Sequence, residues 1–215
     1  MFQYQNIWLP DGEKHFPAWM EKHGEIVNGK GTYQIKKLRE AMRWCKQFRT
    51  AVDVGAHVGL WSMHLAEKFS DIHAFEPVPI FRSCFVRNAA QGNITLHRYP
   101  LGSRDADVAM VYDPADSGGT HVGGAGDMKM RTLDSFGFQD IDFIKIDCEG
   151  YELEVLKGAV ETLKRCRPCV IVEQKPHKLL PNFGIAGKPA VDFLVAMGAV
   201  LRREMGGDFI LSWDA

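Results

Sequence analysis

The sequence predicts an α/β fold: a mostly parallel sheet with helices on both faces and an antiparallel hairpin near the carboxyl terminus. Strand-like and helix-like segments alternate through residues 50–173, which is typical of βαβ units. Two segments that fit strands, 200–203 and 209–213, are joined by Gly206-Gly207-Asp208, which indicates a hairpin. The chain has 215 residues and is 46% apolar, which suffices for one well-packed domain but not for two.

The first predicted strand and the glycine turn after it organise this fold. Residues 50–54 alternate and are rich in β-branched side chains, which predicts a strand. Gly55 and Gly59 permit a sharp turn or the close approach of a ligand. Helical spacing then predicts a helix that begins near His57, with its apolar face formed by Val58, Trp61, Leu65, Ala66 and Phe69. A ligand beyond this strand would meet free backbone N–H groups, with the carboxylate of Asp53 beside them.

Three interpretations of this turn compete. A dinucleotide fingerprint needs a glycine where this chain has His57, whose side chain would obstruct a pyrophosphate, so NAD or FAD is not favoured. Asp53 would also repel phosphates, but it suits a cationic ligand such as the ammonium of a methionine moiety that carries a sulfonium. A plain strand-to-helix turn that binds nothing is the third interpretation.

Charge and hydropathy argue against several classes of protein, although a local basic patch stays possible. The formal net charge of −1 provides no electrostatic footprint for nucleic acid. No run of about 18 apolar residues occurs, and residues 1–9 do not resemble a signal peptide, so we expect a cytoplasmic protein without a membrane partner. The five cysteines form no regular framework, which favours reduced thiols. Cys166 and Cys169 have redox spacing but precede a predicted strand, so catalysis by these thiols is not favoured.

The first 48 residues are expected to form a cover segment and a helix ahead of a main domain at 49–215. Residues 1–31 are turn-rich and without a clear period, and they include the aromatic residues Trp8, Phe16 and Trp19. These side chains would either line the mouth of a site or bury a helix face of the main domain, and the second use is favoured. Thr32 is placed to cap a helix that runs to about Phe48.

Further strands and helices continue the pattern. We predict strands at residues 72–76, 94–101, 107–112, 142–147 and 169–173, and helices after Pro79, after Gly150 and over 189–197. Pro77 and Pro79 end the strand at 72–76, because proline cannot continue a central ladder. Glu76 is therefore expected at an exposed strand tip.

Residues 113–130 contain five glycines and almost no apolar side chain, which predicts a mobile loop. Long loops in compact domains often serve as lids, and we expect this one to close over a bound acceptor. The alternative is a disordered surface loop without a function.

Acidic residues end four of the predicted strands: Asp53, Glu76, Asp147 and Glu173. In an open α/β sheet, ligands bind beyond the carboxyl ends of the strands. Glu76 follows Asp53 by 23 residues, the separation at which a carboxylate on the next strand accepts both hydroxyls of a ribose. One such residue alone would more simply be a helix cap or a solvated end. The four together indicate a site for an adenosine ligand.

Several motifs of this chain occur together with the spacing of a known family: Asp53-Val-Gly-Ala-His-Val-Gly59, Phe75-Glu-Pro77, Asn88, Thr132-Leu-Asp134, Ile144-Lys-Ile-Asp-Cys-Glu-Gly150 and Leu156-Lys-Gly-Ala159. Over roughly residues 50–175 the chain resembles the FkbM-type methyltransferases. The resemblance implies a seven-stranded, Rossmann-like class I methyltransferase fold that binds S-adenosylmethionine. It also implies methyl transfer to an oxygen, often on a sugar or natural product, so a small-molecule or glycan acceptor is expected.

The resemblance also implies roles for individual residues. Gly55 and Gly59 would hold the methionine part of the cofactor, Glu76 the ribose, and residues 101–104, with Gly102 and Ser103, the adenine. Pro77 is expected as a further cofactor-binding residue. His57 departs from the family pattern, in which many members carry asparagine, although its ring could still donate a hydrogen bond to the cofactor. A non-catalytic adenosyl-binding module is the alternative function.

Asp147 is the best candidate to orient or deprotonate the acceptor hydroxyl, with Glu173 as the second, because neighbouring strands would place both at adjacent tips. Asp147 would otherwise cap the helix after Gly150 or contact the cofactor's ammonium. Two adjacent carboxylates could instead bind a divalent metal, with His177 as a further ligand. The residues alone do not favour that arrangement, and we assign no metal ligand.

Overall fold

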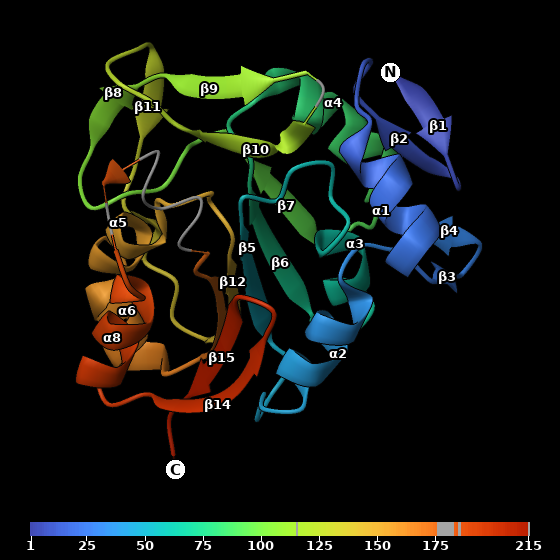
Figure 1. The fold of residues 1–215 in the computed structure, drawn as a ribbon. Coiled ribbons are helices and arrows are strands. Elements are labelled where there is room, and N and C mark those ends of the chain that lie inside the picture. The colour runs from blue at the N-terminus through green and yellow to red at the C-terminus, as the bar shows by residue number, and fades with distance from the viewer. Residues whose placement is uncertain (115, 176–182, 185, 215) are drawn as a thin grey trace.

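The computed structural model describes residues 1–114, 116–175, 183–184 and 186–214. A seven-stranded sheet forms its centre, in the order β14-β15-β13-β12-β5-β6-β7 (Figure 1). The strands are β5 (Thr50–Val54), β6 (Asp71–Phe75), β7 (Ile94–His97), β12 (Ile141–Ile146), β13 (Cys169–Glu173), β14 (Val200–Met205) and β15 (Asp208–Ser212). The first five are mutually parallel, whereas β15 pairs antiparallel with both β13 and β14. The predicted mostly parallel sheet with a carboxyl-terminal hairpin is confirmed.

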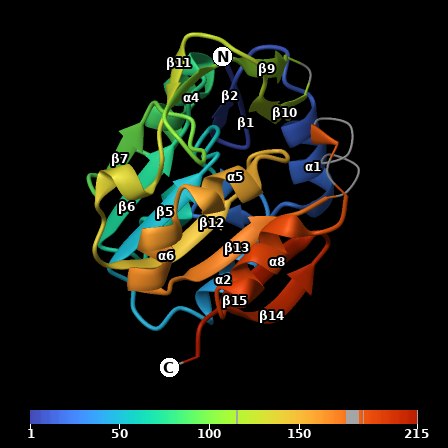
Figure 2. The same cartoon turned by 90° about the vertical axis from the view of Figure 1, so that its left-hand side faces the viewer.

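Helices cover both faces of this sheet (Figures 1 and 2). One face packs against α5 (Glu152–Lys157), α6 (Val160–Cys166) and α8 (Pro189–Ala196), and the other against α2 (Ile35–Met42), α3 (Ser62–Leu65) and α4 (Pro79–Asn88). Strand residues alternate between these layers. Val52 and Val54 face α5 and α6, whereas Ala51 faces α2 and α3. A short 3₁₀ helix at Asp134–Phe136 packs beside α6.

The order of the strands reverses between β5 and β12. From β5 the chain proceeds outward through β6 and β7, and it then returns to place β12 on the other side of β5. Such a reversal leaves a crevice at the carboxyl ends of the two central strands, where α/β proteins bind ligands.

The amino-terminal segment packs on α4. It contains β1 (Phe2–Tyr4), β2 (Ile7–Leu9), α1 (His15–His23), β3 (Ile26–Val27) and β4 (Lys30–Gly31). Asn88 of α4 accepts a hydrogen bond from the Trp8 N–H at 2.7 Å, and its amide donates to the carbonyls of Trp8 and Val58. The segment therefore does bury a helix face, as favoured from the sequence.

Two predicted helices differ in the structure. Thr32 does not cap α2, because its hydroxyl bonds the backbone of Glu25 instead, and the helix spans only Ile35–Met42. The helix expected from His57 is reduced to Ser62–Leu65. His57 has a left-handed φ of 50°, which interrupts a helix at that position.

The described residues of 113–130 do not form the predicted mobile loop. They contain β10 (Asp116–Val122), which pairs with β9 (Met110–Asp113), and β11 (Met128–Met130), which pairs with β8 (Ala106–Val108). The strands form although glycine is frequent, because backbone hydrogen bonds supply the pairing and Val108, Val122 and Met130 share a small apolar cluster. Within the described residues, no helix has both the length and the apolar character needed to cross a membrane.

Candidate functional site

A cavity lies at the carboxyl ends of the central strands. Its walls come from the turn after β5, the residues that follow β6, β7 and β12, the amino-terminal segment and the β9–β10 hairpin. The lining side chains include Phe16, Tyr33, Gly55, His57, Glu76, Pro77, Tyr99, Leu101, Ser117, Lys145, Asp147 and Glu149. Five residues predicted for the site therefore share one cavity: Gly55, His57, Glu76, Pro77 and Asp147.

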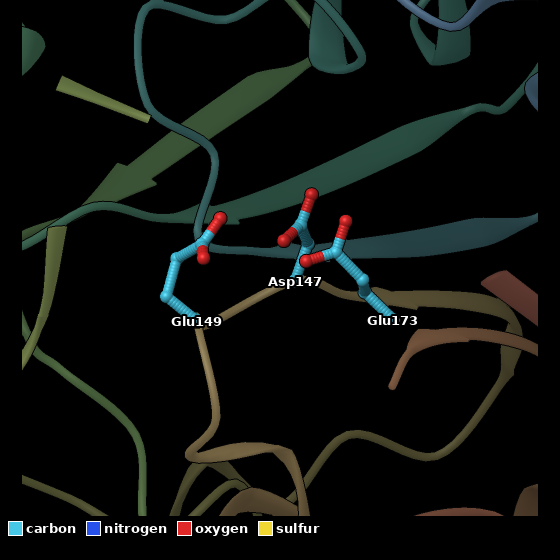
Figure 3. Close-up of side chains that lie close together, drawn as sticks. All are labelled: Asp147, Glu149 and Glu173. Carbon is cyan, nitrogen blue, oxygen red and sulfur yellow. The ribbon is translucent and has the colours of Figure 1, made fainter. Parts of the chain in front are cut away.

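Three carboxylates gather at this end of the sheet, from Asp147, Glu149 and Glu173 (Figure 3). One oxygen of each lies within 4.8 Å of the other two. Asp147 follows β12, and Glu173 is the last residue of β13, the strand paired with β12. The two residues expected to be neighbours do lie together. Glu149 was not singled out from the sequence, although it belongs to the segment 144–150 that carries the family resemblance.

This carboxylate cluster has the donor chemistry of a divalent cation site, since Mg²⁺ and Ca²⁺ prefer oxygen ligands. Glu173 also forms an ion pair with Lys175. His177, the further metal ligand considered from the sequence, lies outside the described residues.

The turn after β5 is fixed by the protein itself. The N–H groups of Gly55 and Ala56 donate to the carbonyl of Phe75 at 3.1 and 3.0 Å, and the N–H of His57 donates to Glu76 at 2.9 Å. The prediction of free N–H groups at this turn is therefore wrong for these three residues. Gly55 has a φ of +73°, and a Cβ on it would lie 2.0 Å from the carbonyl oxygen of Asp147. Glycine is required because the turn after β12 crosses at this point.

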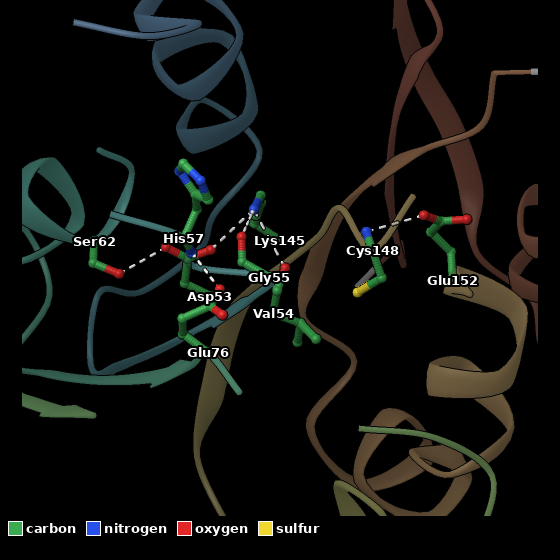
Figure 4. A network of polar contacts seen from close by, with 9 residues as sticks. All are labelled: Asp53, Val54, Gly55, His57, Ser62, Glu76, Lys145, Cys148 and Glu152. Atoms are coloured by element: carbon green, nitrogen blue, oxygen red, sulfur yellow. Dashed lines mark hydrogen bonds and ion pairs between the residues drawn. The ribbon is translucent and has the colours of Figure 1, made fainter. Parts of the chain in front are cut away.

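Asp53 does not face the cavity, contrary to expectation. Its side chain is fully buried, accepts a hydrogen bond from Ser62 at 2.7 Å and pairs with Lys145 at 3.2 Å (Figure 4). The cation beside Asp53 is thus a side chain of the protein. Strand alternation explains this placement, because Asp53 shares the face of Ala51 and points toward α3.

Lys145 connects this ion pair to the turn. Its ammonium donates to the carbonyl of Gly55 at 2.7 Å and to that of Val54 at 3.3 Å (Figure 4). Burial alone would lower the pKa of Lys145, but Asp53 and Asp147 outweigh it and hold the pKa above its ordinary value. Lys145 therefore stays charged and holds the turn that lines the cavity.

Three further residues predicted to contact a cofactor, Gly59, Gly102 and Ser103, are not among the residues that line the cavity. A Cβ on Gly59 would lie 3.0 Å from the Phe85 ring, so this glycine allows α4 to pack closely. A Cβ on Gly102 would meet the side chain of Met130 at 2.4 Å, and the hydroxyl of Ser103 donates to Glu154. These positions support the wall, whereas Tyr99, Pro100 and Leu101 form it.

Glu76 lines the cavity but is not exposed, as a strand tip was expected to be. Only 4% of its surface is accessible, and its two oxygens accept hydrogen bonds from the N–H groups of His57 and Val78, the second at 2.7 Å. Burial raises the pKa of Glu76 to about 7, although both N–H groups act in the opposite direction. Glu76 therefore changes charge near neutral pH in the free protein.

Glu152 fixes the turn that carries the cluster. One of its oxygens accepts hydrogen bonds from the N–H groups of Cys148 and Gly150 at 3.0 and 2.9 Å, and the other from the Gln174 amide at 3.2 Å. Burial raises its pKa to about 7. The sequence signal was a carboxylate in the first turn of the helix after Gly150, a position at which acidic residues bond free N–H groups.

The amino-terminal segment contributes directly to the cavity, which the sequence did not favour. Phe16 stacks on the His57 ring with centroids 4.8 Å apart, and Tyr33 lies 4.8 Å from Phe16. Burial raises the pKa of the Tyr33 hydroxyl, and Asp147, Glu173 and Glu149 raise it further, so Tyr33 remains neutral. No motif marked these residues, because they approach the site only through packing.

Known proteins resemble the chain in sequence. The hexuronic acid methyltransferase AglP of Haloferax volcanii is 33% identical over 130 residues, which cover 56% of this chain and 54% of that protein. Methyltransferase sdnD of Sordaria araneosa is 27% identical over 177 residues, which cover 61% and 68% of the two chains. The chain thus spans about half the length of the first of these relatives.

Solved structures share the fold. The methyltransferase FkbM from Methylobacillus flagellatus KT matches with a TM-score of 0.54 and 18% identity, over 77% of this chain and 44% of that one. A precorrin-6y C5,15-methyltransferase from Geobacter metallireducens matches with a TM-score of 0.51 and 13% identity, over 98% and 100%. The second match supports a class I methyltransferase fold across nearly the whole chain.

The family comparison covers most of the cavity. The methyltransferase FkbM domain matches residues 53–184, which is more than half of the chain and includes Gly55, Glu76 and Asp147. The chain belongs to the FkbM methyltransferase domain family.

Proposed function

We propose that this protein is an S-adenosylmethionine-dependent methyltransferase that methylates a hydroxyl of a sugar or another small molecule. One observation supports this most directly: Glu76 and Asp147 line a single cavity at the point where the strand order reverses. Ligands of open α/β sheets bind at such points. The chain spans only part of its curated relatives, so its activity and its acceptor are both part of the proposal.

The residues of the cavity fit the proposed cofactor. Each carboxylate oxygen of Glu76 accepts one backbone N–H, and its remaining lone pair can accept a hydroxyl of a ribose. Gly55 leaves the wall without a side chain, and Tyr99 and Leu101 supply apolar surface for an adenine ring.

When bound, S-adenosylmethionine supplies a methyl group that an oxygen nucleophile can attack. An aliphatic hydroxyl needs to lose its proton as the new bond forms, and a positioned base accelerates such reactions by about 10²–10⁴-fold. Asp147 is assigned this role, with Glu173 as the second candidate, because both belong to the cluster and Asp147 also lines the cavity. Glu149 would orient the hydroxyl or share its proton.

The acceptor is proposed from the composition of the cavity walls. Aromatic side chains of Phe16, Tyr33 and Tyr151 lie on one cavity with the carboxylates of Asp147 and Glu149. Ring faces pack against the apolar side of a sugar, while carboxylates accept its hydroxyls. A relative that acts on a hexuronic acid supports a sugar acceptor.

Two experiments test the proposal. Calorimetric titration with S-adenosylmethionine and with NAD should show saturable binding of the first only. Incubation of the protein with radiolabelled methyl donor and fractionated small-molecule extracts should then yield a labelled product whose methyl group resists mild base, as an ether does and an ester does not. Binding without any labelled product would favour the non-catalytic adenosyl-binding module.

A further inference from the structure

Glu13, Ser117 and His57 form a chain of hydrogen bonds that connects three separate parts of the structure. Glu13 precedes α1, Ser117 lies on β10 and His57 belongs to the turn after β5. The Glu13 carboxylate accepts hydrogen bonds from the Phe16 N–H at 3.0 Å, from the Ser117 N–H at 2.9 Å and from the Ser117 hydroxyl. The Ser117 Oγ lies 2.8 Å from Nε2 of His57. Glu13 and Ser117 are both almost completely buried.

The direction of these hydrogen bonds determines which nitrogen of His57 carries the proton. The Ser117 hydroxyl has one proton, and it donates that proton to the Glu13 carboxylate. Ser117 Oγ can then only accept from the imidazole, so Nε2 of His57 must be the protonated nitrogen. Nδ1 is left with a lone pair.

That lone pair is buried and has no hydrogen-bond partner among the described residues. His57 lines the cavity, held between the rings of Phe16 and Phe81, with centroid distances of 4.8 and 4.2 Å. Burial lowers the pKa of His57 to about 3, so the ring is neutral at pH 7. A buried acceptor without a partner costs free energy, which a donor on a bound ligand would recover.

We propose that Glu13 and Ser117 orient and polarise His57 so that Nδ1 accepts a hydrogen bond from the bound cofactor, from a hydroxyl or an ammonium. This inference rests on the proposed function. The cofactor is the chosen ligand because the N–H of His57 already binds Glu76, the residue assigned to the ribose. The sequence allowed for a His57 ring that donates a hydrogen bond to the cofactor, whereas in this geometry Nδ1 accepts one. Glu13 and Ser117 are positioning residues in this scheme.

The test combines nitrogen NMR with calorimetry, with S-adenosylhomocysteine as the stable probe. In the wild-type protein, His57 should show a protonated Nε2 and an unprotonated Nδ1, and the Nδ1 resonance should move on saturation as it accepts a hydrogen bond. Ser117→Ala should give a mixture of both tautomers and about fivefold weaker binding, as expected for one neutral hydrogen bond. Asp116→Asn, one residue earlier on the same strand and exposed, should behave as wild type.

Each outcome is decisive. A wild-type ring protonated on Nδ1, or an Nδ1 resonance that does not move in the saturated complex, would overturn the inference but leave cofactor binding intact. A wild-type protein that binds no S-adenosylhomocysteine would overturn both this inference and the proposed function. The wild-type spectra decide the question even if Ser117→Ala does not fold.

Discussion

Lys145 and Asp53 face each other across neighbouring parallel strands and form a buried ion pair, with Nζ 3.2 Å from Oδ1. Removal of one charge from a buried pair leaves the other uncompensated, which costs about 3–5 kcal/mol. Lys145→Met should therefore lower the free energy of unfolding by about this amount in a denaturant titration. The double variant Lys145→Met/Asp53→Leu should recover part of the loss. Equal losses in the single and double variants would show that the pairing itself contributes little.

Glu76 should make cofactor affinity depend on pH. Its pKa is raised to about 7, so the carboxylate that accepts the ribose hydroxyls is present above that pH and is protonated below it. Affinity for S-adenosylmethionine should fall by up to about tenfold per unit as pH decreases from 7 toward 5. Glu76→Gln should bind at least about tenfold more weakly at pH 8 and lack this dependence. A wild-type affinity that is constant between pH 5 and 8 would contradict the role of Glu76.

The same raised pKa affects the stability of the free protein. In the pH interval between its ordinary value of 4.5 and about 7, the folded state holds a proton on Glu76 that the unfolded state releases. The free energy of unfolding should therefore decrease as pH rises through this interval, by at most about 1.4 kcal/mol per unit from this group. The contribution of Glu76 is measured by thermal unfolding of wild type and Glu76→Gln at several pH values. It is the difference between the two proteins in how the free energy of unfolding changes with pH. An identical pH profile for both proteins would refute it.

Asp147→Asn should separate chemistry from binding. The amide keeps the size of the side chain but cannot take a proton, so turnover should fall by about 10²–10⁴-fold with little change in cofactor affinity. Lost cofactor binding would instead identify Asp147 as a cofactor ligand, and normal turnover would exclude a catalytic role. A chelator added to wild type tests the carboxylate cluster in parallel: loss of turnover that Mg²⁺ restores would reveal a metal at Asp147, Glu149 and Glu173.

Gly55 should tolerate no side chain, and Gly137 provides a matched control. Both have a left-handed φ, +73° and +67°, but a Cβ on Gly55 would lie 2.0 Å from the Asp147 carbonyl, while nothing lies within 4 Å of one on Gly137. Gly137→Ala should cost about 1–2 kcal/mol from backbone strain alone. Gly55→Ala should cost about 1–3 kcal/mol more, because of the clash. If chemical denaturation gave equal losses of stability for Gly55→Ala and Gly137→Ala, the turns after β5 and β12 would be able to move apart at little cost.

The β9–β10 hairpin is proposed to close over the acceptor. Its residues Ser117, Gly118 and Thr120 line the cavity, and Gly118 lies against Phe16 of the amino-terminal segment. Limited proteolysis within residues 110–122 should be slow in wild type, faster in Phe16→Ala, and slower again when cofactor and true acceptor are both bound. Cleavage rates that ligands do not change would argue that the hairpin is a static wall.

Short apolar runs located the strands of the central sheet well, because a buried strand needs such a run whatever surrounds it. The predictions at 72–76 and 142–147 fall within one residue of β6 and β12. The strand predicted at 94–101 was too long, since β7 ends at His97, and the one predicted at 107–112 is divided between β8 and β9. The strands within 113–130 were not predicted. Their pairing depends on backbone hydrogen bonds, which side-chain composition does not reveal. The helix expected after His57 was too long, because spacing alone does not reveal a left-handed residue.

The sequence by itself determined the fold class, the family and the acidic residues that end the strands. Only the tertiary structure decided what each acid does. Asp53 and Asp147 have the same chemistry, but the alternation of β5 directs Asp53 to Lys145, while Asp147 lies beyond β12 in the cavity wall. The contact between Glu13 and Ser117 joins residues 104 positions apart. Such contacts depend on how distant segments pack, and no local pattern in a sequence encodes the distance between them.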